Sequence, residues 1–174
     1  TVPADKVVSP ELKQAGHKLY LIKHNALANY MPNVEQLKEN WTYTTNAIQS
    51  GKVCATYALG FGGVAEAIAK MSFGNELAVD IQIAENELFD YNYGSILVEA
   101  TEDLSLPAAQ YIGTVIEGTH LVINGEQVSR EVLLHACCGQ FDKIYPSAVP
   151  AQHQTLMPAD TLPLTSNLSP LTYK

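Results

Sequence analysis

Apolar and polar residues alternate most regularly over residues 77–83, where one leucine, one valine and two isoleucines occupy every second position. A period of two predicts a β-strand with one buried face. Runs rich in β-branched and aromatic residues predict further strands over residues 17–23, 52–59, 95–101 and 111–118. Asn124-Gly125 separates two short apolar runs, and this dipeptide favours the type I′ turn of a β-hairpin.

Residues 34–50 show the spacing of an amphipathic helix. Asn33 is a favourable N-cap with Gln36 three residues later, and Gly51 suits the position after the helix end. Four large apolar residues share one face at helical spacing: Val34, Leu37, Trp41 and Ile48.

Two further helices are predicted over residues 63–73 and 130–138. Ser9, followed by proline, predicts a helical turn that ends at Gly16, and residues 85–94 form a short helix or turn. Helices alternate with strands in the first half of the chain, and strands cluster in the second. This order predicts an α+β fold, a layered mixed β-sheet with packed helices.

The length of 174 residues suits one domain, and 47% hydrophobic with 16% charged residues is typical of a globular chain. Five prolines fall within the last thirty residues, which show no hydrophobic periodicity. We therefore predict a folded domain over residues 1–145 and a Pro-rich linker or tail over residues 146–174.

Ten basic against eighteen acidic residues leave a formal net charge of −8, and the lysines are scattered. This balance argues against nucleic acid or an anionic membrane as a partner. No apolar run reaches the ~20 residues of a membrane span, and three cysteines without framework spacing do not indicate a disulfide scaffold. We expect a cytoplasmic location and, because the chain starts at Thr1 rather than methionine, a segment of a longer protein.

Gly60, Gly62 and Gly63 form a turn between a predicted strand and a predicted helix. Glycines at a helix N-terminus allow backbone N–H groups to approach a phosphate, where the helix dipole favours negative charge. The same glycines also suit a tight corner in which Cβ atoms would clash. Neither G-x-G-x-x-G nor G-K-[ST] is present, so both interpretations stay open.

We expect structural roles for most of the histidines, cysteines and carboxylates. The five histidines lack the spacing of metal ligands, and we assign no metal residue. Cys137 and Cys138 end a predicted helix, where the dipole disfavours the thiolate of a nucleophile, so we expect them to pack in the core. Six carboxylates predict a solvated acidic rim, with an acid/base or metal pair as the alternative: Glu85, Glu87, Asp90, Glu99, Glu102 and Asp103. We assign no catalytic residue.

Four segments together resemble the C-terminal-type domain of the aminoimidazole ribonucleotide synthetase superfamily: VSPELKQAGHKLYLIK, GKVCATYALGFGGVAEAIAKMSFGN, ELFDYNYGSILVEA and YIGTVIEGTHLVINGEQVSREVL. The resemblance covers about residues 4–145 and is most specific in GGVAEAIAKMSFGN. Within the superfamily, the chain is most similar to the large single-chain phosphoribosylformylglycinamidine synthases of purine biosynthesis.

That resemblance implies a parent enzyme with two tandem pairs of N-type and C-type domains, followed by a glutaminase domain. The parent would use ATP, Mg²⁺ and glutamine to convert formylglycinamide ribonucleotide into formylglycinamidine ribonucleotide. The chain resembles the second C-type domain and the linker toward the glutaminase. The implied partners are therefore the N-type nucleotide-binding domain and the glutaminase domain, with a homodimer through exposed domain faces as a further possibility.

One departure from the family pattern concerns the glycine turn. Many members read His-Asp-x-Ser-Asp-Gly-Gly there, with the aspartates near metal and phosphate. The matching acid positions hold Ala58 and Phe61, and a Gly-Arg pair is replaced by Gly94-Ser95. Methyl and phenyl groups do not ligate Mg²⁺. We expect a structural half of a ligase that is inactive alone and holds no cofactor, with a stand-alone binding or oligomerisation module as the alternative.

Overall fold

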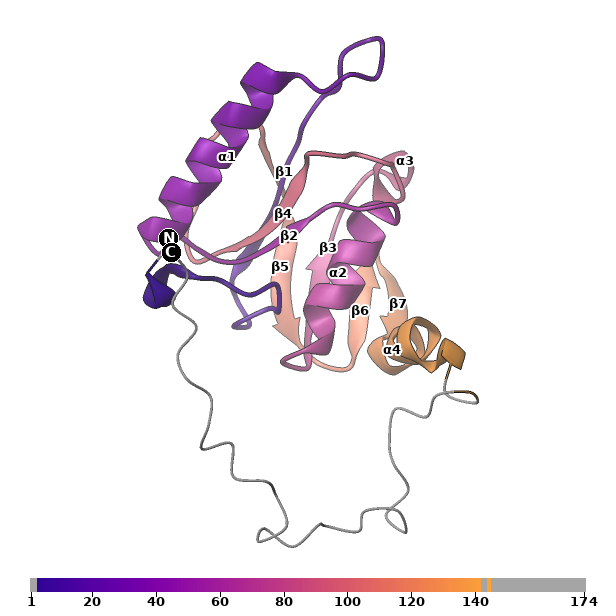
Figure 1. The fold of residues 1–174 in the computed structure, drawn as a ribbon. Coiled ribbons are helices and arrows are strands. Elements are labelled where there is room, and N and C mark those ends of the chain that lie inside the picture. The colour runs from indigo at the N-terminus through magenta and orange to yellow at the C-terminus, as the bar shows by residue number, and fades with distance from the viewer. Residues whose placement is uncertain (1–2, 142–143, 145–174) are drawn as a thin grey trace, which may run out of the picture. The chain divides into compact units, whose positions relative to one another are not determined.

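Seven strands form one sheet in the computed structural model, which describes residues 3–141 and 144. The strands are β1 (Lys18–Ile22), β2 (Val53–Ala58), β3 (Leu77–Ile81), β4 (Ile96–Ala100), β5 (Ala109–Glu117), β6 (His120–Ile123) and β7 (Glu126–Ser129). Their order across the sheet is β2-β4-β1-β5-β3-β6-β7 (Figure 1). Neighbours pair antiparallel except β3 and β6, which are parallel. The predicted α+β class with a mixed sheet is confirmed.

The helices are α1 (Val34–Gln49), α2 (Gly63–Phe73), α3 (Glu85–Leu88) and α4 (Arg130–Cys138), with 3-10 turns at Ala4–Lys6 and Gly139–Phe141. None of these described helices combines the length and the apolar character that crossing a membrane requires. The chain divides into two units after Gly139, and all that follows concerns the first unit. The predicted tail over residues 146–174 lies outside the described residues.

The core lies on both faces of the sheet. Leu19 and Leu21 of β1 pack in a cluster with α2, whereas Tyr20 and Ile22 pack in a second cluster with α1. Successive side chains of a strand point to opposite faces, so α1 and α2 cover opposite faces of the sheet.

Helix α2 and the hairpin follow the sequence closely. The bounds of α2 are those predicted, and its predicted inner residues Val64, Ile68 and Met71 are buried. Asn124 and Gly125 have φ angles of 52° and 87°, which confirms the type I′ pattern of positive φ at both turn residues.

The apolar face predicted for α1 is only partly buried, with Ile48 packed against the core. Trp41 is 53% exposed and Val34 is also exposed, whereas Asn40 is 1% exposed. The Asn40 side-chain amide donates to the carbonyl of Lys23 at 2.9 Å, and a buried polar group with a partner is tolerated. Thr44 lies one turn further along the same buried side, and Ala47 two turns further. The helix cap was predicted correctly, since Asn33 Oδ1 accepts from the Gln36 N–H at 3.2 Å.

The helical turn predicted to begin at Ser9 is wrong, because no helix forms between residues 7 and 16. The backbone N–H groups of Lys13 and Gln14 donate to the Glu99 carboxylate, at 2.8 and 3.1 Å. The Leu12 N–H donates to the carbonyl of Met71 at 2.9 Å. These long-range bonds use the donors that a helical turn would have needed.

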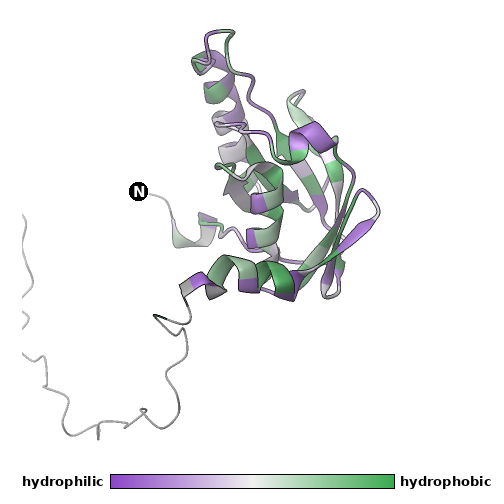
Figure 2. Ribbon diagram, turned by 90° about the vertical axis from the view of Figure 1, so that its right-hand side faces the viewer, coloured by the Kyte–Doolittle hydropathy of each residue, from purple (hydrophilic) through white to green (hydrophobic). Residues whose placement is uncertain are grey.

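The expectation that Cys137 and Cys138 pack in the core is wrong, because both are exposed. Figure 2 shows apolar residues along α4, the helix that carries them. Leu133 is the residue of α4 that packs against the core, while Val132 and Leu134 are exposed.

Candidate functional site

The glycine turn joins the end of β2 to the start of α2. The Gly63 N–H donates to the carbonyl of Gly60 at 3.2 Å, and Gly63 has a φ of +63°. A Cβ on Gly63 would lie 2.8 Å from the carbonyl oxygen of Asp90 and 3.0 Å from that of Leu88. Close backbone packing therefore accounts for glycine at this position.

The Gly62 N–H already has an acceptor within the chain. Glu66 Oε2 accepts from it at 2.9 Å, and Glu66 Oε1 accepts from the Lys70 ammonium at 2.5 Å. The Lys70 hydrogen bond and then the Gly62 N–H lower the pKa of Glu66 below its ordinary value of 4.5, so the carboxylate is charged at neutral pH. The Glu66 carboxylate thus already accepts the Gly62 N–H, which a phosphate at this turn would need as a donor.

The two positions that hold acids in the resembling family are both on the surface. Ala58 is exposed at the end of β2, and Phe61 is 85% exposed. The Phe61 ring contacts Tyr91 edge-on with centroids 5.7 Å apart, and Tyr91 contacts Tyr93 at 4.3 Å. We call Phe61, Tyr91 and Tyr93 the aromatic cluster.

A pocket of about 700 Å³ lies beside the N-terminal half of α2, between α3 and the β6–β7 hairpin. Its walls are mainly apolar, with Leu88, Leu121 and Ile123 among them. Its charged lining residues are Glu85 and Glu126. Two carboxylates repel a phosphate group, so this pocket does not complement a nucleotide.

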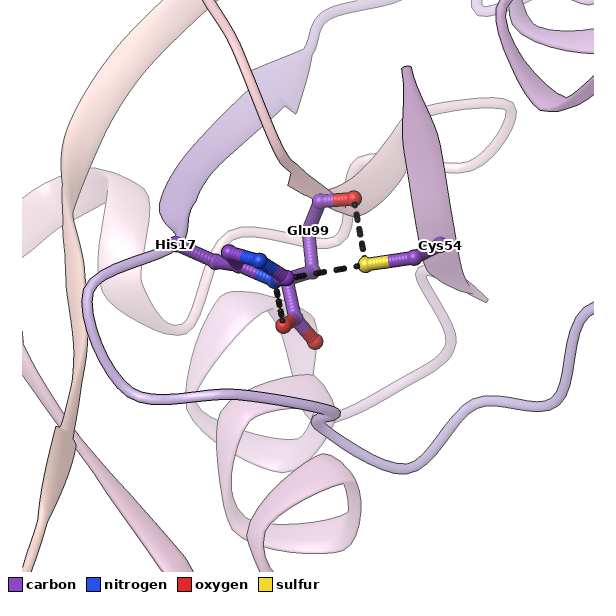
Figure 3. A group of neighbouring side chains, drawn as sticks. All are labelled: His17, Cys54 and Glu99. Carbon is purple, nitrogen blue, oxygen red and sulfur yellow. Dashed lines mark hydrogen bonds and ion pairs between the residues drawn. The ribbon is translucent and has the colours of Figure 1, made fainter. Parts of the chain in front are cut away.

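The structure also brings together a second group of side chains, which the sequence did not predict. His17, Cys54 and Glu99 meet on one face of the sheet (Figure 3). The Glu99 Oε1 atom lies 2.7 Å from His17 Nδ1, and Cys54 Sγ lies 3.6 Å from the same nitrogen. Glu99 is 0% exposed, whereas the His17 side chain is 18% exposed. We call these three residues the His-Cys-Glu cluster.

Three adjacent strands build the His-Cys-Glu cluster. Glu99 lies in β4, which pairs with β1 on one side and β2 on the other, and His17 directly precedes β1. The pairing of β2 with β4 shifts register between Val53 and Ala55, which leaves Cys54 as the extra residue of a β-bulge. Val53 packs on the α1 face and Ala55 on the α2 face, so the bulge reorients the strand at Cys54.

The electrostatics of the His-Cys-Glu cluster exclude a cysteine nucleophile. Burial, followed by the charge of Glu99, raises the pKa of the Cys54 thiol to about 12. The thiol and the carboxylate also contact the same ring nitrogen of His17, whereas a nucleophile–His–acid triad uses both nitrogens. What remains is a set of three ligand atoms within 4.8 Å of one another, the one such group in the described part of the chain.

Sequence reasoning missed this cluster because its members lie 37 and 45 residues apart. It placed Glu99 in a solvated rim, which is wrong for this residue. The available signal was the alternation in β4, where Glu99 shares a face with Leu97 of the buried core. Other acids of the predicted rim pair with separate lysines: Glu87 with Lys23, Glu102 with Lys52 and Asp103 with Lys18.

The architecture is that of a layered α+β domain with a mixed sheet, the class predicted from the order of helices and strands. Three solved structures from Thermotoga maritima share this fold. They are PurLQS (TM-score 0.65, 14% identity), phosphoribosylformylglycinamidine synthase II (0.63, 13%) and PurL complexed with ATP (0.58, 13%). Each match covers 76% of this chain and 28% of the other.

The chain thus spans little more than a quarter of the length of these proteins. At such identities the similarity shows the fold alone. No family model and no curated protein sequence matches the chain.

Proposed function

We propose that this chain is a catalytically silent C-type domain of a phosphoribosylformylglycinamidine synthase-like enzyme, which supports the active domains and binds no Mg-nucleotide at its own glycine turn. The observation that carries the proposal is the Glu66 carboxylate on the Gly62 N–H. Ala58 and Phe61 supply no oxygen ligand at the acid positions. These side chains therefore offer no ligand for a metal ion that would offset the negative charge of Glu66. The shared fold with PurL supports the enzyme class.

The role left for such a domain is contact with its neighbours. Where the resembling family has an aspartate, this chain exposes Phe61, and the aromatic cluster extends that apolar surface. Phe89 is also exposed, beside the backbone that packs on Gly63. Exposed aromatic side chains are enriched where protein surfaces meet. The implied partner is the N-type domain of the same enzyme.

The direct test is a titration of the ¹⁵N-labelled chain with Mg-ADP and Mg-ATP, followed through the amide signals of Gly60, Gly62 and Gly63. We expect no saturable shift at micromolar nucleotide. The Glu66→Ala variant is the matched comparison, because it exposes the Gly62 N–H without restoring the acids. It should show only a weak phosphate response that does not depend on Mg²⁺. Micromolar, Mg²⁺-dependent saturation of the wild-type turn would refute the proposal.

A stand-alone binding or oligomerisation module is the second candidate. Large apolar side chains are exposed in the first half of α1 and just before it: Tyr30, Met31, Val34 and Trp41. Exposed apolar surface of this kind is common where protein chains associate. Sedimentation analysis separates the two candidates. A tight dimer that dissociates in Trp41→Glu but not in Phe61→Glu favours the second candidate.

A further inference from the structure

We propose that the His-Cys-Glu cluster binds one divalent transition-metal ion, with Zn²⁺ as the best match to its donor atoms. This inference is independent of the proposed function, because it involves none of the residues of the glycine turn and no nucleotide.

The chemical types of the three donor atoms indicate which metal ion the cluster would bind. The cluster offers an imidazole nitrogen, a sulfur and a carboxylate oxygen, from His17, Cys54 and Glu99. Mg²⁺ and Ca²⁺ prefer oxygen ligands, whereas a mixed nitrogen, sulfur and oxygen set suits Zn²⁺ and neighbouring transition metals. Zinc sites built from three protein ligands retain a fourth position for water or another ligand.

One of the donor separations already matches that of a zinc site. Zinc bonds of about 2.3 Å to sulfur and about 2.05 Å to nitrogen, at tetrahedral angles, place the two atoms roughly 3.6 Å apart. Cys54 Sγ and His17 Nδ1 are separated by 3.6 Å. The 2.7 Å between His17 Nδ1 and Glu99 Oε1 is a hydrogen bond. An ion would replace that bond and lengthen the separation to about 3.3 Å.

The surroundings hold the donors in place. The Glu99 carboxylate is fixed by the backbone N–H groups of Lys13 and Gln14, which is the kind of outer contact that orients metal ligands. The bulge in β2 directs Cys54 to the same point. A fully buried carboxylate is costly without a compensating positive charge, and a bound cation supplies one.

The ion would join the segment that precedes β1 to β2 and β4. His17 belongs to that segment, while Cys54 and Glu99 belong to the two strands. Because the site forms only in the folded chain, binding stabilises the native state. The expected consequence is a structural ion that holds the N-terminal segment to the sheet.

The test uses the full chain, stripped of metal with a chelator and titrated with Zn²⁺ and with Co²⁺. We expect one equivalent of either ion, visible tetrahedral bands for Co²⁺, and a thiolate-to-cobalt charge-transfer band. Cys54→Ser should abolish the charge-transfer band, and Cys54→Ser and His17→Gln should each weaken Zn²⁺ binding by more than 100-fold. The double variant Cys137→Ser/Cys138→Ser is the matched control and should keep the stoichiometry and the band.

Folding is checked separately by circular dichroism, and His17→Gln serves as the second ligand variant if Cys54→Ser misfolds. Two outcomes would overturn the proposal. One is the absence of stoichiometric Zn²⁺ or Co²⁺ binding by the folded wild-type chain, which would leave the cluster as a hydrogen-bonded ion pair. The other is a charge-transfer band that survives Cys54→Ser and disappears in the Cys137/Cys138 control.

Discussion

Glu66 caps the glycine turn at the start of its own helix, because its Oε2 atom accepts the Gly62 N–H at 2.9 Å. The other oxygen accepts from Lys70 one helical turn further on. A single carboxylate thereby satisfies an N–H that has no partner inside the helix and pairs with a lysine on its surface. An internal carboxylate thus accepts an N–H that the sequence analysis considered for a phosphate.

Removing this carboxylate should weaken the start of α2. We expect Glu66→Ala to lower the free energy of unfolding by about 1 kcal/mol, the loss of one charge-assisted hydrogen bond and one partly exposed ion pair. Urea denaturation measures the change. Glu66→Gln keeps an oxygen acceptor for the Gly62 N–H and should lose about half as much. Equal losses in the two variants would mean that the ion pair with Lys70 is the main contribution.

The contribution of Glu66 should also depend on pH. Its pKa is lowered in the folded chain from an ordinary value of 4.5, with Lys70 and then the Gly62 N–H as the main causes. A lowered carboxyl pKa stabilises the fold above the unfolded-state value, and the stabilisation is lost as pH falls through the folded-state value. The stability gap between wild type and Glu66→Ala should therefore be full at pH 7 and should shrink below about pH 4.5. A gap that widens in acid contradicts this assignment.

Gly63 should be intolerant of any side chain. Gly63→Ala forces a Cβ to 2.8 Å from the Asp90 carbonyl at a φ of +63°, and we expect a loss of about 2 to 3 kcal/mol in thermal or urea unfolding. Gly60→Ala is the control, because its Cβ would meet Glu66 Oε2 at an ordinary 3.4 Å. Similar losses at the two positions would show that the contact with Asp90 does not decide the choice of glycine.

The three cysteines should react at different rates. Burial and the charge of Glu99 raise the pKa of Cys54 to about 12, so only about 10⁻⁴ of it is thiolate at pH 8. Cys137 and Cys138 are exposed on α4. Timed alkylation of the metal-free chain, followed by peptide mass spectrometry, should therefore label the α4 cysteines well before Cys54. Comparable rates at all three sites would contradict the environment described for Cys54.

The buried face of α1 can be tested with two neighbouring residues. Asn40→Ala removes the nearer of two side-chain donors to the carbonyl of Lys23, the other being the Gln36 amide at 3.4 Å, and should cost about 1 to 3 kcal/mol. Trp41→Ala removes a side chain that is 53% exposed and should cost less than about 1 kcal/mol. Urea unfolding of both variants shows which substitution lowers the free energy of unfolding more. A larger loss for Trp41→Ala would mean that the apolar face of α1 contributes more to its packing than the side that carries Asn40.

Short-range features of the fold were predictable from the sequence. Helix α2, bounded by glycines at both ends, begins and ends as predicted, and Asn124-Gly125 forms the expected turn. The cap at Asn33 was also predicted. Each of these depends on residues a few positions apart, and local backbone preferences are strong there.

Features that depend on distant partners were not predictable. Asn40 is buried because the carbonyl of Lys23, 17 residues away, accepts its hydrogen bond. The segment before β1 forms no helix, and Glu99 accepts its N–H groups across 86 and 85 residues. The predicted phosphate contact at Gly60, Gly62 and Gly63 stays a prediction, and the contact between Gly62 and Glu66 argues against it.

The sequence by itself determined the strands, helices α1, α2 and α4 and the glycine corner, since these follow from periodicity and from residues that favour particular backbone angles. Only the tertiary structure decided which side chains meet. His17, Cys54 and Glu99 come together because β4 pairs with both β1 and β2 and a bulge displaces Cys54. Strand order and register depend on the packing of the whole sheet, so they cannot be predicted from a local pattern of residues.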